Sequence, residues 1–335
     1  MLQLSIAACV AIAGLLLAGL GFSAWKAHAI ETEFPNHGEL IDVGRYRMNS
    51  LHLPAGPDAD LPPIVFIHGA SGNLRDQETA FRPALEGRGE LLFVDRPGHG
   101  YSERGGAQND FPDGQADALA LLMEKRGIER AIIVGHSFGG AIAASFALRH
   151  PQKTLGLLFL ASATHPWPGG VDWYYDLARA PYVGWLFSRV IAVPAGLTRL
   201  EGATRGVFSP NPRPERYVTQ GAPALVLRPA NFRYNAIDVA NLNDYARRIA
   251  PLYRSIKTPT VIISGNRDPV VAEEIHSVGL RQDIEGSELV WLDNVGHKPD
   301  YVATAIAVAA IEKLAGSDRD LQEAARRFEA PLAAR

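Results

Sequence analysis

A chain of 335 residues with 47% hydrophobic and 21% charged side chains has the composition of a globular protein that can bury a large interior. Its formal net charge of −3 gives no electrostatic basis for binding nucleic acid. Cys9 is the only cysteine, which excludes an intrachain disulfide and a multi-cysteine metal site.

Residues 1–29 form the most apolar segment of the chain, and the first charged side chain is Lys26. A helix of about 24 residues spans roughly 36 Å, which is enough to cross a hydrocarbon core of about 30 Å. The segment therefore favours an uncleaved single-pass membrane anchor over a helix buried in the core. The alternative is a signal peptide cleaved after Ala29, which would leave a secreted or periplasmic protein, because residues 27–29 read AHA. However, a basic n-region is missing, and the apolar run exceeds the usual length of about 7 to 15 residues.

From Leu40 onward the pattern predicts an α/β core in two parts, residues 30–164 and residues 255–316. Short runs rich in β-branched and large apolar residues end in glycine, proline or asparagine, and helical periods follow them. Because these runs are almost continuously apolar, we expect a mostly parallel sheet with helices on both faces. One helix is expected over residues 113–127, where an apolar stripe ends at a glycine. The runs read PPIVFIHG, ELLFVDRPGHG, AIIVGHS, LGLLFLASAT, TPTVIISGNRD and ELVWLDNVGH.

Residues 165–254 interrupt this pattern. They hold 13 aromatic residues and 10 of the chain's 23 prolines, with 11 arginines, no lysine and 6 acidic residues. No run within them has the character of a sheet strand, so we expect a mostly helical cap above the sheet. One cluster of aromatic side chains is expected to pack mainly in the core of the cap, with one or two of them reaching the pocket: Trp167, Trp173, Tyr174, Tyr175, Trp185 and Phe187. Residues 317–335 are polar and predict a peripheral helix or a frayed tail.

A serine stands between two glycines where strand character gives way to helix character. Residues 135–139 read GHSFG, after the strand run AIIV and at the start of the helical run FGGAIAASFALRH. This is the G-x-S-x-G nucleophile elbow, in which a sharp turn strains the serine backbone and leaves no room for side chains two positions away. The turn would raise the Ser137 hydroxyl above the sheet at a helix N-terminus, which favours negative charge.

Two further polar side chains follow strand runs later in the chain. Asp268 lies four residues beyond VIIS, and His297 lies just after LVWLDN. A serine hydroxyl needs a base to take its proton, and the base needs an acid to orient it. Because parallel strands bring their carboxyl ends to one edge, we expect Ser137, His297 and Asp268 to meet there as nucleophile, base and acid. Asp268 could also cap a helix that starts at Pro269, and His297 could also be a surface or helix-capping histidine.

The loop after the first strong strand run completes the candidate site. Residues 68–73 read HGASGN, and a loop in this position donates one backbone N–H to the oxyanion hole. We assign the two donors to Ala70 and to Phe138, the residue after the nucleophile. The candidates for contact with the substrate are His68, Gly69, His136 and Trp167, although His68 is also suited to bracing the loop through a hydrogen bond.

Four motifs in this order make residues 40–315 resemble the α/β-hydrolases with a helical cap, the group of serine esterases, proline iminopeptidases and cofactor-free haloperoxidases. The order Ser, Asp, His along the chain is that of this family. Residues 95–102, DRPGHGYS, are similar to a signature of the group, and the resemblance implies that this loop is structural or lines the pocket. Epoxide hydrolases and haloalkane dehalogenases carry aspartate at the elbow, so Ser137 disfavours their chemistry.

The residues and the resemblance predict a serine hydrolase that cleaves a carboxylic ester through an acyl-enzyme, without a cofactor or a metal ion. The aromatic cap favours an ester that is lipid-like or small and apolar. The same triad could instead carry out cofactor-free perhydrolysis or haloperoxidation, carbon–carbon bond hydrolysis, peptide hydrolysis or acyl transfer. A non-catalytic binding module is the remaining alternative. The expected partners are the ester and, through residues 1–29, a membrane.

Overall fold

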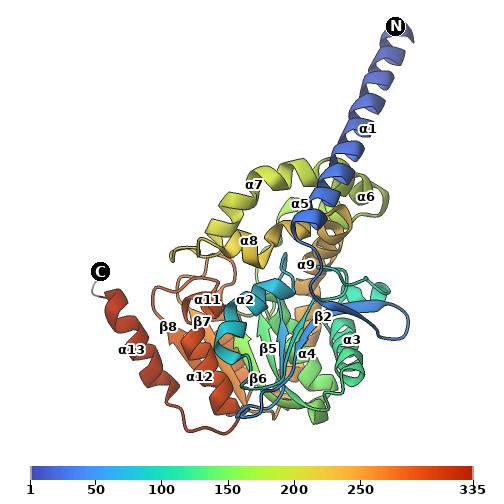
Figure 1. The fold of residues 1–335 in the computed structure, drawn as a ribbon. Coiled ribbons are helices and arrows are strands. Elements are labelled where there is room, and N and C mark those ends of the chain that lie inside the picture. Colours follow the sequence, from blue (N-terminus) through green and yellow to red (C-terminus); the bar gives the residue numbers. More distant parts are fainter. Residues whose placement is uncertain (1, 334–335) are drawn as a thin grey trace.

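The computed structural model describes residues 2–333, whose centre is an eight-stranded sheet in the order β1-β2-β4-β3-β5-β6-β7-β8 (Figure 1). β2 runs antiparallel to both of its neighbours, and all the other pairs are parallel. The prediction of a mostly parallel sheet is confirmed, and β1 and β2 are additions that no sequence run indicated. The strands are β1 (Glu39–Asp42), β2 (Arg47–Leu53), β3 (Ile64–Ile67), β4 (Leu91–Val94), β5 (Ala131–His136), β6 (Thr154–Leu160), β7 (Thr260–Gly265) and β8 (Glu288–Leu292).

Helices cover both faces of this sheet (Figure 1). One face carries α2 (Leu74–Leu85), α12 (Thr304–Leu314) and α13 (Leu321–Ala333), and the other carries α3 (Pro112–Lys125), α4 (Phe138–Arg149) and α10 (Glu273–Asp283). Along β3, Val65 and Ile67 pack toward α3 and α4, whereas Ile64 and Phe66 pack toward α2 and α12. Since alternate side chains of a strand point to opposite faces, burial of both faces explains the unbroken apolar runs.

A helical insertion between β6 and β7 lies over one end of the sheet (Figure 1). It consists of α5 (Trp173–Arg179), α6 (Pro181–Val190), α7 (Ala192–Gly206), α8 (Tyr217–Gly221), the 3-10 helix η3 (Pro223–Leu227), α9 (Pro229–Ile249) and the 3-10 helix η4 (Ala250–Ser255). The described residues from 165 to 254 form no strand, as the sequence predicts. α9 packs against α5 and α6 and also against α3 and α4, so it joins the insertion to the core.

Of the two readings for residues 317–335, a peripheral helix or a frayed tail, the structure has the helix α13, and residues 334–335 lie outside the described residues. Leu321 and Ala325 of α13 are buried in the cluster on its face of the sheet, and Phe328 packs against the same cluster. A single apolar stripe is therefore enough to fix α13 along β8 although the segment is polar overall. The remaining short helices are η1 (Ala107–Asp110), η2 (Pro151–Lys153) and α11 (Pro299–Val302).

The N-terminal helix α1 (Leu2–Glu33) is continuous and projects away from the rest of the chain (Figure 1). Its segment Ser5–Glu33 contains an 18-residue window of mean hydropathy 2.3 that is 0% buried, so α1 is not a core helix. By length and composition it is a candidate membrane span. Its C-terminal part packs on the cap, where Ile30 is buried beside Leu225 and Leu227.

Candidate active site

Ser137 occupies the sharp turn between β5 and α4, with φ 52° and ψ −120°. A positive φ is strained for any residue other than glycine. A Cβ on Gly135 would lie 2.6 Å from the carbonyl oxygen of Gly139, and a Cβ on Gly139 would lie 2.3 Å from that of Ile67. Both flanking positions therefore require glycine, for the steric reason expected at a nucleophile elbow.

The structure brings Ser137, His297 and Asp268 together from the ends of β5, β8 and β7. His297 Nε2 lies 3.0 Å from Ser137 Oγ, and His297 Nδ1 lies 2.7 Å from Asp268 Oδ2. His297 and Ser137 are both buried beside a cavity that they line. The helix that could have started at Pro269 begins instead at Glu273, so Asp268 belongs to a turn and does not cap that helix.

Asp268 is held in place by its own turn. Its Oδ1 accepts the backbone N–H groups of Val270 and Val271 at 2.7 and 2.9 Å, which leaves Oδ2 to face His297. Burial raises the pKa of Asp268, but attraction to His297 and these hydrogen bonds outweigh burial and keep that pKa below its ordinary value. Because Asp268 is ionised at neutral pH, it accepts a hydrogen bond from His297 Nδ1–H, and the lone pair of Nε2 faces the Ser137 hydroxyl.

The loop after β3 lies beside Ser137. Ala70 lines the same cavity, and a Cβ on Gly69 would lie 2.9 Å from Ser137 Cβ. Among residues 2–333, no group accepts a hydrogen bond from the N–H of Ala70 or from the N–H of Phe138, the first residue of α4. Both N–H groups can therefore donate to an anion formed at Ser137.

The four residues predicted to contact substrate occupy different environments. His136 lines the cavity, and its Nε2–H donates to the carbonyl oxygen of His297 at 2.9 Å. His68 is buried behind the loop, where its Nδ1 lies 2.8 Å from the Gly69 carbonyl oxygen. Trp167 packs against His276, with ring centroids 5.7 Å apart. Of these four residues, only His136 lines the cavity as it is formed by residues 2–333.

The cavity above Ser137 has a volume of about 580 Å³, within the range of about 300 to 1,000 Å³ typical of small-molecule sites. The cap supplies most of its wall. Of the six aromatic side chains expected mainly in the core of the cap, Trp173, Tyr174, Tyr175 and Phe187 line the cavity, which is more than the one or two expected there. They are joined by aliphatic side chains and by Arg199 and Asn235. The large apolar lining residues are Trp173, Tyr174, Tyr175, Phe187, Ile191, Leu200, Val207, Tyr217, Val226, Leu227, Phe232 and Val270.

The chain matches the family profile of the alpha/beta hydrolase fold over residues 62–301. It belongs to the α/β-hydrolase family. Over 101 residues it is 35% identical to the dihydrolipoyllysine-residue acetyltransferase component of the acetoin cleaving system of Pseudomonas putida. The matched stretch covers 30% of this chain and 27% of the acetyltransferase component. Over 242 residues it is 24% identical to Lipase 3 of Moraxella sp. (strain TA144), covering 71% of this chain and 72% of the lipase. The fold aligns with a membrane phospholipase A, a bacterial virulence factor, at a TM-score of 0.65 and 22% identity, covering 94% of this chain and 98% of the phospholipase.

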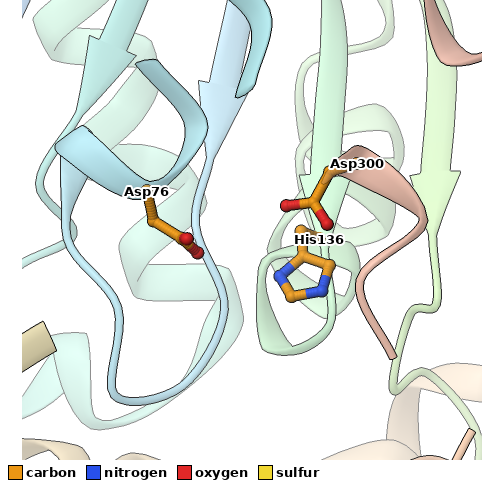
Figure 2. Close-up of side chains that lie close together, drawn as sticks. All are labelled: Asp76, His136 and Asp300. Carbon is orange, nitrogen blue, oxygen red and sulfur yellow. The ribbon is translucent and has the colours of Figure 1, made fainter. Parts of the chain in front are cut away.

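Beside the candidate base, this α/β-hydrolase buries a cluster of charges. Lys298 Nζ donates to Asp76 Oδ2 at 2.8 Å and lies 2.9 Å from Asp300 Oδ2, and all three side chains are buried. Figure 2 shows Asp76 of α2, His136 at the end of β5 and Asp300 of α11 converging, with candidate ligand atoms within 4.8 Å of one another. This spacing suits a cation, and the Lys298 ammonium supplies positive charge to both carboxylates.

The Lys298 cluster fixes the loop that carries His297. Burial disfavours the ammonium, but the Asp300 and Asp76 carboxylates outweigh burial and raise the pKa of Lys298 above its ordinary value. Tyr301 places its ring 4.9 Å from Nζ and donates its hydroxyl to the Asp76 carbonyl at 2.7 Å. Sequence reasoning missed this cluster, and the one local signal was the pair of charged residues in HKPD after a predicted buried strand.

Proposed function

We propose that this α/β-hydrolase cleaves a carboxylic ester, with Ser137 as nucleophile, His297 as general base and Asp268 as the orienting acid. The observation that carries the proposal is the pair of hydrogen bonds, 3.0 and 2.7 Å long, that joins Oγ through both ring nitrogens to the carboxylate. A binding module would not need this arrangement. The similarity to Lipase 3 of Moraxella supports an ester as the substrate.

The reaction follows from the geometry. Ser137 Oγ attacks the ester carbonyl carbon while His297 Nε2 takes the hydroxyl proton, and the N–H groups of Ala70 and Phe138 bind the oxyanion. The intermediate expels the alcohol, which receives the proton from His297. Water then attacks the acyl-enzyme and gives its proton to His297, which returns it to Ser137 as the acid leaves. Asp268 remains ionised and stabilises the imidazolium throughout.

The cavity wall favours an ester with an apolar acyl or alcohol group, because most of the surface above Ser137 is aromatic or aliphatic. Perhydrolysis, haloperoxidation, carbon–carbon bond hydrolysis, peptide hydrolysis and acyl transfer could use the same three side chains. They differ in the group that attacks or leaves, so product analysis separates them from ester hydrolysis.

A fluorophosphonate probe is expected to label Ser137 in the folded protein, because the probe reacts with a serine that a neighbouring base activates.

The kcat/KM for hydrolysis of p-nitrophenyl esters should rise by roughly fourfold for each methylene added to the acyl chain, until that chain fills the cavity. The reason is that each buried methylene contributes about 0.8 kcal/mol. Peptide mapping by mass spectrometry locates the label, and absorbance follows the ester series. A folded protein that leaves Ser137 unlabelled would refute the proposal, and halogenation or peptide cleavage without ester hydrolysis would favour an alternative.

We further propose that residues 1–29 anchor the protein in a membrane, that residues 30–164 and 255–316 form the catalytic core, and that residues 165–254 cap it. The uncharged part of α1 continues to Trp25. The end of α6 packs against this uncharged part, because a Cβ on Gly19 would lie 2.7 Å from Val190 Cγ1. Gly19 and Trp25 are separated by about 9 Å along a helix. In a membrane-spanning α1, the end of α6 would thus lie at the membrane surface.

The exposed side chains of α6 support this placement. Tyr182 is 91% exposed, Trp185 is 48% exposed, and the Arg189 guanidinium lies 4.4 Å from the Trp185 ring centroid. Tyrosine and tryptophan are enriched where proteins meet the membrane–water interface, and arginine can extend toward the headgroups. The cap would then face a source of lipid esters.

Gly19→Leu is expected to destabilise the protein relative to Gly14→Leu by about 1 to 3 kcal/mol, because overpacking forces α1 and α6 apart. A Cβ on Gly14 would meet no atom within 4 Å, so the Gly14 variant controls for helix propensity and hydrophobicity. Thermal unfolding in detergent measures the difference. A second experiment tests the anchor itself by extracting membranes with carbonate and measuring the intact mass of the protein. An anchored protein stays in the membrane at full mass, whereas a membrane-free chain that begins at Ile30 would show cleavage instead.

A further inference from the structure

The DRPGHGYS loop after β4 has no role in the mechanism above, yet it contacts both parts of the candidate oxyanion hole. Arg96 Nη2 lies 3.3 Å from the carbonyl oxygen of Gly69, and the Arg96 guanidinium carbon lies 4.4 Å from the ring centroid of Phe138. Gly69 precedes one N–H donor, Ala70, and Phe138 supplies the other. A single buried guanidinium therefore touches the two residues whose placement decides how an oxyanion would be held.

The contact with Gly69 controls the direction of the Ala70 N–H. A peptide bond is planar and trans, so its C=O and N–H point in opposite directions. The Arg96 backbone N–H donates to His68 Nε2 at 3.1 Å, which leaves the ring proton on Nδ1 to donate to the Gly69 carbonyl at 2.8 Å. Burial and the charge of Arg96 hold the pKa of His68 well below its usual range, consistent with a neutral ring. Two side-chain donors, joined by the Gly72 N–H at 3.4 Å, thus hold this carbonyl on one side and turn the Ala70 N–H to the other.

Arg96 depends on the cap for its own position. Its Nη1 donates to Asp238 Oδ2 of α9 at 2.7 Å, and both side chains are buried. Asp238 also accepts from Arg104 at 2.7 Å and from Gln115 at 3.0 Å, so core residues surround this carboxylate of the cap. A buried guanidinium without an anionic partner is strongly disfavoured. Asp238 therefore keeps Arg96 beneath the candidate oxyanion hole.

A second contact from α9 reaches the same loop one helical turn earlier. Asn235 Oδ1 accepts the Ser71 N–H at 2.6 Å, and Asn235 Nδ2 donates to Ser71 Oγ at 3.1 Å. Ser71 has a φ of 58°, a strained conformation that needs support from its surroundings. Asn235 and Asp238, three positions apart, share one face of the helix. α9 therefore supports the residue after Ala70 directly and the residue before it through Arg96.

We propose that the cap helix α9 sets the oxyanion hole through Asp238–Arg96 and Asn235–Ser71, which makes Arg96, Asp238 and Asn235 positioning residues for transition-state stabilisation. The proposal rests on the proposed serine mechanism. The cap then has two roles, because a helix that helps to line the substrate cavity also orients the backbone donor beside the nucleophile. Displacement of α9 would lower turnover without changing the triad.

The test uses Asp238→Asn and Asn235→Ala in the full-length protein in detergent, with Asn241→Ala as the matched control. Asn241 also joins α9 to the core, through a 3.2 Å hydrogen bond to the Asp110 carbonyl, but it does not touch the oxyanion loop. We expect kcat to fall by about 10- to 100-fold in the first two variants, since loss of one donor costs about 10²- to 10³-fold. KM should stay within about threefold, and Asn241→Ala should retain full activity.

Inhibition by a trifluoromethyl ketone, which forms a tetrahedral adduct at the serine, separates positioning from a structural role. Its Ki is expected to rise by the same factor as kcat/KM falls in each variant. If Asp238→Asn does not fold, Asn235→Ala decides, because it leaves the buried ion pairs intact. Folded variants with kcat within twofold of Asn241→Ala, or with a change in KM alone, would overturn the inference. Fluorophosphonate labelling of the wild type at Ser137 shows independently whether the serine mechanism holds.

Discussion

Ser137→Ala is expected to lower kcat for ester hydrolysis by about 10⁴- to 10⁶-fold, because triad members act as a unit and the remaining groups cannot supply a nucleophile. KM should change little, since the hydroxyl contributes little volume to the cavity. Stopped assays with high enzyme concentration measure the residual rate.

Asp268→Asn should also lower kcat strongly, because the 2.7 Å contact with His297 Nδ1 no longer selects the tautomer that accepts the serine proton.

The matched control for Ser137→Ala is Ser145→Ala. Ser145 is buried on the same helix, α4, where its hydroxyl bonds to the Ala141 carbonyl and to the Tyr245 hydroxyl, away from the cavity lining. Its variant should retain full kcat with a modest loss of stability. Ester hydrolysis by Ser137→Ala at the level of Ser145→Ala would exclude the serine mechanism, including the assignment of His297 as base.

Lys298→Met is expected to reduce the free energy of unfolding by about 3 to 5 kcal/mol, because it leaves Asp76 and Asp300 buried without their cation. The matched control is Lys257→Met. Lys257 pairs with Glu285 at 3.0 Å, but the two side chains are 69% and 84% exposed, so the loss should be at most about 1 kcal/mol. Chemical denaturation in detergent measures both variants.

The double variant Lys298→Met/Asp300→Asn tests the cause of that loss. Removing one carboxylate charge should restore part of the stability, since fewer unpaired charges remain buried. Equal losses in Lys298→Met and Lys257→Met would show that the cluster does not stabilise the fold. Because Lys298 adjoins His297, a folded Lys298→Met protein should also lose activity through displacement of the base.

Local patterns were enough to predict the strand runs, the elbow and the order of the three polar groups. Ser137 could be singled out because glycines two positions away are a local steric requirement, visible in five residues. Asp268 and His297 could be placed because parallel strands end at one edge, so a residue just after a buried run has a predictable location. The distances of 3.0 and 2.7 Å among them come only from the folded chain.

The pairs that support this site were not predictable in the same way. Lys298 and Asp76 are 222 positions apart, and Arg96 and Asp238 are 142 positions apart. Nothing in the residues around either carboxylate distinguishes it from an acidic residue exposed on a helix. The aromatic side chains of the cap were likewise visible as a cluster, but whether they packed together or lined a cavity depended on how α5 to α9 cover the sheet.

The amino-acid sequence by itself determined the class of fold, the strained serine turn and the apolar N-terminal segment, because backbone sterics and hydrophobic periodicity act over a few neighbouring residues. Tertiary structure alone decided which buried charges pair, which cap residues border the cavity and how α9 reaches the oxyanion loop. These contacts form between elements that are distant in the chain. Their free energy depends on joint removal of both partners from water, which only the packed fold achieves.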